Sequence, residues 1–100
     1  MHTLRTKNRK PTHPGAILRE DVLPVLNISQ TELAKRLGVS RRTISQILNE
    51  HRPLTADMAI RLAHLLNTTP ESWLNMQQAL DLWELQHRNA RIYAQIKKVA

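Results

Sequence analysis

The chain has no cysteine and no phenylalanine, and only 2 of its 100 residues are glycine. Without cysteine it has no disulfide framework, no thiolate nucleophile and no cysteine-type zinc site. Two glycines are too few for a glycine-rich loop that cradles phosphate. Because phenylalanine is absent and glycine is scarce, we expect helices packed through Leu, Ile and Ala rather than an aromatic-rich β-sheet.

Long apolar runs are also absent. The longest are short, such as LAHLL at Leu62–Leu66, so no segment is long enough to span a membrane. The basic N-terminus MHTLRTKNRKPTHP is not followed by an apolar stretch and is therefore not a secretory signal. These absences, together with that of cysteine, favour a cytoplasmic location and no membrane partner.

Acidic residues are few: 8 Asp and Glu stand against 15 Lys and Arg, which gives a net charge of +7. Such an excess points to a polyanionic partner, and nucleic acid fits it better than a membrane surface does. A basic, solvated surface without any partner explains the composition equally well. Charge alone leaves both interpretations open.

Motifs for catalysis or cofactor binding are missing as well. The sequence has no nucleophile elbow, phosphate-binding loop or carboxylate pair that would indicate an active site. The histidines are not spaced as metal ligands are, and we interpret them as structural or surface residues: His2, His13, His51, His64 and His87. We therefore expect neither an enzyme nor a metal or cofactor site.

The length of 100 residues fits one domain with one core. We expect a mobile basic arm at residues 1–12, a helical domain at 13–85 and a basic extension at 86–100. Pro14 opens the first helix, and Pro24 is predicted to bend or end it near Leu23. The arm either follows a nucleic-acid groove or is merely solvated. The extension continues a helix, binds a partner or is disordered, and the sequence leaves these alternatives open.

Capping residues indicate four further helices. Side chains with hydroxyl acceptors precede each of them: Ser29, Ser40, Thr55 and Thr69. Glu32 completes a capping box with the first of these residues. Gly38 and Asn67 suit the left-handed residue that ends a helix, and apolar side chains recur at spacings of three and four. With a last helix from Glu71 to at least Leu85, the sequence predicts an all-α fold of five helices.

Two of the predicted helices, joined by a turn at Gly38, form a helix-turn-helix, in which the second helix enters the DNA major groove. At about 100° per residue, Ile44, Ile47 and Leu48 share the buried face of that helix. Arg41 and Arg42 lie in its first turn, where the helix dipole disfavours positive charge. A bound phosphate or guanine edge would offset this unfavourable interaction. The opposite face, with Arg41 at its edge, carries side chains that bind bases: Arg42, Ser45, Gln46 and Asn49.

The segment SQTELAKRLGVSRRTISQILN (residues 29–49) resembles the helix-turn-helix of the Xre/Cro/phage-repressor superfamily. HPGAILRED (13–21) and RPLTADMAIRLAHLLNTTPESWLNMQQALDLWE (52–84) extend the resemblance to the HigA antitoxins, also labelled virulence-associated protein I. The resemblance implies a dimeric, lambda-repressor-like domain of five helices that binds its own operator and often neutralises an mRNA-cleaving RelE-type toxin, HigB. It also implies that Gln30 contacts phosphate and that further residues approach bases or backbone: Arg41, Arg42, Thr43, Ser45 and Gln46.

Two positions depart from the family pattern. The family usually has Asn-Gly after the second motif helix, whereas this chain has Asn49-Glu50, so a residue other than glycine must form the left-handed exit. Antitoxins also tend to present acidic residues to a basic toxin, but this chain is basic and its adjacent acidic pair is Glu20-Asp21. The second departure weakens the inference of toxin binding and leaves that of DNA binding intact.

The last helix carries more apolar side chains than a core of this size covers, and these form the candidate dimer interface: Leu80, Leu82, Trp83 and Leu85. A homodimer would place two recognition helices on a palindromic operator in double-stranded DNA. We therefore expect an autoregulatory repressor of the antitoxin type. The alternatives are a module that mainly masks a toxin, a stand-alone Xre-type regulator, and an RNA-binding scaffold, which the lack of an aromatic stacking surface disfavours.

Overall fold

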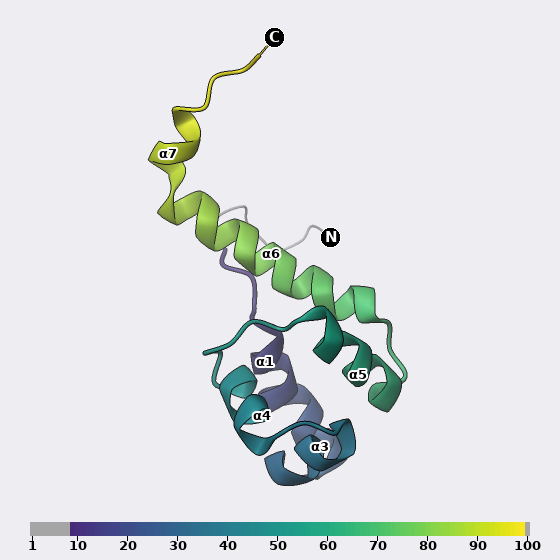
Figure 1. Ribbon diagram of the computed structural model, residues 1–100. Coiled ribbons are helices and arrows are strands. Elements are labelled where there is room, and N and C mark those ends of the chain that lie inside the picture. Colours follow the sequence, from purple (N-terminus) through teal and green to yellow (C-terminus); the bar gives the residue numbers. More distant parts are fainter. Residues whose placement is uncertain (1–8, 100) are drawn as a thin grey trace, which may run out of the picture.

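The computed structural model describes residues 9–99, in which all regular secondary structure is helical. The elements follow one another as shown in Figure 1: α1 (Pro14–Ile17), η1 (Leu18–Val22), α2 (Leu23–Leu26), α3 (Gln30–Leu37), α4 (Arg41–Leu48), α5 (Ala56–Leu66), α6 (Pro70–Arg88) and α7 (Ala90–Ala94). Since α1, η1 and α2 are consecutive, they form one helical rod. This arrangement confirms the predicted all-α fold and adds the short α7.

Of the two predicted effects of Pro24, that it ends the first helix near Leu23 is wrong, because helical structure continues through this residue. The rod continues to Leu26 because η1 is a π-helical segment, in which the N–H of Leu23 donates to the carbonyl of Leu18 five residues earlier. The wider turn accommodates the proline ring, which would otherwise clash with the carbonyl four residues before it. The rod ends instead at Asn27, whose φ of 56° is left-handed.

The predicted caps of the other helices form as expected. Each side-chain hydroxyl accepts a hydrogen bond from the backbone N–H three residues later: Ser29, Ser40, Thr55 and Thr69. Gly38 and Asn67, with φ of 74° and 55°, end α3 and α5. Because these bonds are local, they determine where α3, α4, α5 and α6 begin.

The core lies where α1, α3, α4, α5 and α6 meet, and it consists of aliphatic side chains together with Trp73. Leu33, Ile47 and Leu62 are each at most 1% exposed. At Gly15, α1 passes so close to α4 that an added Cβ would lie 1.8 Å from the carbonyl oxygen of Ile47. Glycine is therefore required at this crossing, since a side chain does not fit between the two backbones.

The long helix α6 crosses the domain on the side opposite α3, as Figure 1 shows. Its buried residues are Trp73, Gln77 and Leu80, all in the part that packs on the core. Gln77 attaches α6 to the loop after α4, because its Oε1 accepts a hydrogen bond from the N–H of Leu54 at 2.8 Å. The predicted boundary after residue 85 falls inside α6, and the break in the helix comes at Asn89. In the described residues, no helix combines the length and apolarity needed to cross a membrane.

Candidate nucleic-acid interface

The predicted helix-turn-helix is formed by α3, α4 and the tight turn between them. Gly38 adopts the left-handed conformation, and the N–H of Val39 donates to the carbonyl of Ala34 at 3.0 Å. This bond closes the C-terminal end of α3. Ser40 then caps α4 after one intervening residue, so a short, hydrogen-bonded turn determines the angle between the two helices.

One face of α4 is buried and the opposite face is free, as its sequence predicts. Ile44, Ile47 and Leu48 are each at most 1% exposed. The residues predicted to contact DNA lie away from this face at different depths. Three of them are exposed: Arg41, Arg42 and Asn49. Three others are half-buried: Thr43, Ser45 and Gln46. Gln30, at the first position of α3, is also half-buried.

Arg41 and Arg42 form an exposed cationic pair in the first turn of α4. Neither forms an ion pair within residues 9–99, whereas Arg36 and Arg61 each bond a carboxylate of their own helix at 2.8 Å. The helix dipole and the free N–H groups of the first turn add positive potential at the same end of α4. This end therefore suits a phosphate group or the acceptor edge of guanine.

Four of the predicted contact residues are partly held or buried inside the protein: Thr43, Ser45, Gln46 and Asn49. Asn49 Nδ2 donates to the hydroxyl of Ser45 at 3.4 Å. The hydroxyl of Thr43 hydrogen-bonds to that of Ser40 at 2.9 Å and accepts from Arg52 Nη1 at 3.3 Å, so it supports the start of α4. Oε1 of Gln46 is buried, and within the described residues it has no hydrogen-bond partner. A bidentate contact with adenine needs both amide atoms, so Gln46 would have to change its rotamer to make one.

Three arginines outside the motif reach it, and sequence analysis did not identify them: Arg19, Arg52 and Arg61. Arg52 donates to the first turn of α4 from the loop that follows this helix. Arg61 donates to the carbonyl of Leu37 at 2.7 Å, and Arg19 donates to that of Leu48. The last two contacts join residues 24 and 29 positions apart. No local spacing marks such contacts, so only the fold reveals them.

Glu50 forms the left-handed exit from α4, as the departure from the family pattern required. Its φ is 63°, and its N–H donates to the carbonyl of Ile47 at 3.0 Å. Its Oε2 lies 3.3 Å from Nη1 of Arg19, which joins the exit to η1. The pKa of Arg19 is raised above its ordinary value, chiefly by the hydrogen bond to Glu20 and further by that to Glu50.

The histidines do not assemble a metal site in the described part of the chain, where no group of three or more His, Cys, Asp or Glu side chains could hold an ion. His13 is buried, and its Nδ1 accepts from the N–H of Gly15 at 2.9 Å. It therefore caps α1 as a structural residue, in agreement with the prediction. His64 is exposed on α5, also as predicted.

The candidate dimer interface needs one correction. Leu80 is 3% exposed and packs inside its own chain, because it faces the core from α6 and is not available to a partner. Leu82 and Leu85 are 53% and 40% exposed. Together with Tyr93 of α7 they line a groove of about 590 Å³. The apolar surface thus lies where α6 meets α7.

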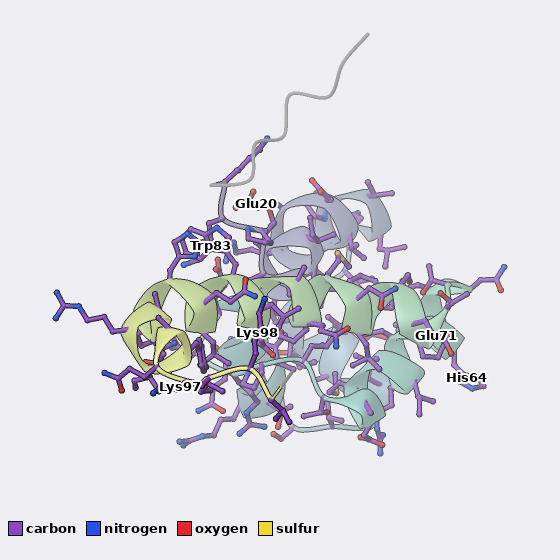
Figure 2. The ribbon with its side chains drawn as sticks, turned by 90° about the horizontal axis from the view of Figure 1, so that it is seen from above. Glu20, His64, Glu71, Trp83, Lys97 and Lys98 are labelled. Carbon is purple, nitrogen blue, oxygen red and sulfur yellow. The ribbon has the colours of Figure 1, made fainter. Side chains whose placement is uncertain are left out.

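Trp83 is half-buried and stacks on His87, with ring centroids 3.9 Å apart. Figure 2 shows it toward one end of α6, with Glu71 at the other end. Its indole N–H is buried and has no hydrogen-bond partner within residues 9–99. The ring therefore covers part of the helix surface and is less available for a partner than Leu82.

The predicted basic arm lies largely outside the described residues, and this includes Arg5 and Lys7. Its last part, residues 9–12, is described and precedes α1. Lys10 Nζ lies 3.3 Å from Oε2 of Glu84 on α6. This exposed pair places the end of the arm beside α6.

Residues 26–74 match the family described as helix-turn-helix. The chain is 41% identical to antitoxin HigA-1 of Vibrio cholerae over 85 residues, which cover 85% of this chain and 80% of that protein. It is 48% identical to virulence-associated protein I of Dichelobacter nodosus over 77 residues, which cover 76% and 71% of the two chains.

A solved structure of antitoxin HigA from Pseudomonas aeruginosa with the higBA promoter has a TM-score of 0.85 at 37% identity. The match covers 91% of this chain and 100% of that one. These similarities confirm the resemblance found in the sequence, and they place the chain in a class of DNA-binding proteins without enzymatic activity. The chain belongs to the helix-turn-helix family of transcriptional regulators that includes the HigA antitoxins.

Proposed function

We propose that this chain is a homodimeric repressor that binds its own operator in double-stranded DNA and acts as the antitoxin of a HigBA-type pair. The observation that carries the proposal is the cationic pair Arg41–Arg42, which forms no ion pair within residues 9–99 and lies at the positive end of a helix whose apolar face is buried. The solved structure of the relative HigA with the higBA promoter supports the same mode of action. Such a protein would act in the cytoplasm, where the DNA is.

In this proposal α4 lies in the major groove with its N-terminal end toward the bases. Arg42 and Asn49 donate to base edges, and Arg41 contacts either a base or a phosphate. Gln30 contacts a phosphate from the start of α3. Ser45 and Gln46 contact bases from closer to the helix surface or after a rotamer change. Thr43, whose hydroxyl is held by Ser40 and Arg52, approaches the DNA backbone rather than a base.

The dimer interface is proposed at the junction of α6 and α7. Leu82 and Leu85 are exposed there, and Trp83 stands between them in the sequence. Burial of this apolar surface would stabilise a two-fold dimer. Two recognition helices would then bind half-sites about 34–36 Å apart, which is one turn of DNA.

A second candidate function is neutralisation of a RelE-type toxin, with DNA binding incidental. The name of the relative HigA-1 favours a toxin partner. Asp21 is exposed and offers it an acidic group next to Glu20, which is exposed but pairs with Arg19 at 2.7 Å. Co-purification with the product of a toxin-sized reading frame beside this gene would test it. If no adjacent product binds, the chain is a stand-alone regulator.

Selection of binding sites from random duplexes tests the DNA-binding proposal. We expect enrichment of a palindrome whose half-sites are one helical turn apart, because the dimer presents two copies of α4. Enrichment of a single half-site would contradict the dimer. Recovery of unenriched sequence would contradict specific binding.

A further inference from the structure

Each helix of the motif receives an arginine at its C-terminal end from a different element. Arg61 of α5 donates to the carbonyl of Leu37, the last residue of α3, at 2.7 Å. Arg19 of η1 donates to the carbonyl of Leu48, the last residue of α4. The last carbonyls of a helix lack partners within it and lie at the negative end of its dipole, so a guanidinium stabilises them.

Both arginines are in turn held by carboxylates. Arg61 Nε donates to Oδ2 of Asp57 at 2.8 Å. Arg19 bonds Oε2 of Glu20 at 2.7 Å through Nη2, and Nη1 lies 3.3 Å from Oε2 of Glu50. A guanidinium serves such acceptors together because its donors form a rigid planar fork. The ammonium group of lysine carries the same charge without this geometry.

We propose that Arg19 and Arg61 are positioning residues that set the orientation of α4 for binding DNA. The inference rests on the proposed DNA-binding function and names residues outside the contact surface. Arg61 holds the end of α3 and the turn, while Arg19 holds the far end of α4 against the first helical rod. Attraction to phosphate depends on charge, whereas contacts with bases depend on the angle of the helix. Loss of either guanidinium therefore weakens binding to the operator more than binding to unrelated DNA.

The test uses Arg19→Lys and Arg61→Lys, which leave the net charge unchanged. Dissociation constants for the selected operator and for an unrelated duplex are measured by fluorescence anisotropy, at a temperature where circular dichroism shows each variant folded. We expect about tenfold weaker binding to the operator and a change of less than about twofold for the unrelated duplex. The matched control is Arg36→Lys, since within residues 9–99 Arg36 bonds only Glu32, which lies on its own helix, at 2.8 Å. This control is expected to keep the parent protein's ratio of operator affinity to unrelated-duplex affinity.

Amide hydrogen exchange locates the effect. Arg19→Lys is expected to speed exchange at the C-terminal end of α4 and to leave α3 unchanged. Arg61→Lys is expected to speed exchange at the C-terminal end of α3 and to leave α4 unchanged. If both variants keep the parent ratio of operator to unrelated affinity, the positioning role is wrong, whatever their thermal stability. If the parent itself shows no preference for any sequence, the proposed function fails first, and the two failures are thereby distinguished.

Discussion

Glu50 adopts a backbone conformation that carries a cost for any residue with a side chain. Its φ of 63° lies in the left-handed region, where an L-residue is destabilised by roughly 1–2 kcal/mol. Its ion pair with Arg19 offsets only part of this cost, because exposed pairs contribute little. The end of the recognition helix therefore contains a small strain that the usual family glycine would lack.

Glu50→Gly is expected to raise the free energy of unfolding by about 0.5–1 kcal/mol, since glycine adopts the left-handed conformation freely. Urea denaturation followed by circular dichroism measures this change. Asn67→Gly is the control, because asparagine already tolerates its φ of 55° and gains less. A loss of stability in the Glu50 variant would show that the ion pair outweighs the backbone term.

The two glycines are expected to respond differently to alanine. In Gly15→Ala the new methyl group would lie 1.8 Å from a backbone oxygen of α4, so α1 and α4 must separate at a cost of about 3 kcal/mol or more. In Gly38→Ala the nearest atom is the flexible end of Arg61 at 3.3 Å, and the left-handed backbone costs about 1 kcal/mol. Thermal unfolding of both variants ranks the two effects. The reverse ranking would contradict the close helix crossing.

At the scale of the element, α4 combines a buried apolar face with polar side chains of two kinds. Arg42 is exposed, and Asn49 is exposed but donates from Nδ2 to the hydroxyl of Ser45 at 3.4 Å. Thr43 hydrogen-bonds to Ser40 and Arg52. Side chains on one helix therefore divide between those that hold the helix in place and those that we propose to contact DNA. Mutation separates these roles, because the first affects stability and the second affects sequence preference.

Arg42→Ala is expected to reduce discrimination between the operator and a substituted site by about 1–3 kcal/mol, the contribution of one bidentate base contact. Thr43→Val keeps the side-chain shape and removes the hydroxyl. It is expected to lower stability by about 1 kcal/mol without changing base preference. Competition binding with single-base variants of the operator measures the first effect, and denaturation measures the second. An altered base preference in Thr43→Val would show that this residue contacts a base.

At the scale of the whole molecule, the net charge of +7 predicts a strong dependence of DNA affinity on salt. The logarithm of the binding constant is expected to fall linearly with the logarithm of salt concentration, with a slope of about −0.9 for each phosphate neutralised. Titrations from low to moderate salt on operator and unrelated DNA measure this slope. A nearly flat response would mean that the positive charge serves another purpose.

Leu85→Glu is expected to shift the protein toward monomer, because it places a charge on the exposed apolar surface between α6 and α7. Operator affinity falls more than affinity for unrelated DNA, since specific binding needs both recognition helices. Light scattering and operator binding on one sample measure both effects. Leu80→Ala is the contrast: this residue is 3% exposed, so its loss lowers stability by about 2–5 kcal/mol through a core cavity. A fully dimeric Leu85→Glu protein would place the interface elsewhere.

Much of this architecture was predictable because it depends on local chemistry. Ser29 and Ser40 cap their helices through the N–H three residues later, and Gly38 supplies the left-handed turn between them. The periodicity of Ile44, Ile47 and Leu48 determines which face of α4 is buried, and hence which face is free. The sequence alone thus determined the helix-turn-helix and which face of α4 is left exposed.

Tertiary structure decided what depends on distant segments. Pro24 continues a helix because a π-helical turn makes room for its ring, and Leu80 belongs to the core because α6 turns it inward. Arg19 and Arg61 bond carbonyls 29 and 24 positions away, where helices from different parts of the chain meet. No local pattern encodes such meetings, because they follow from the packing of the whole core.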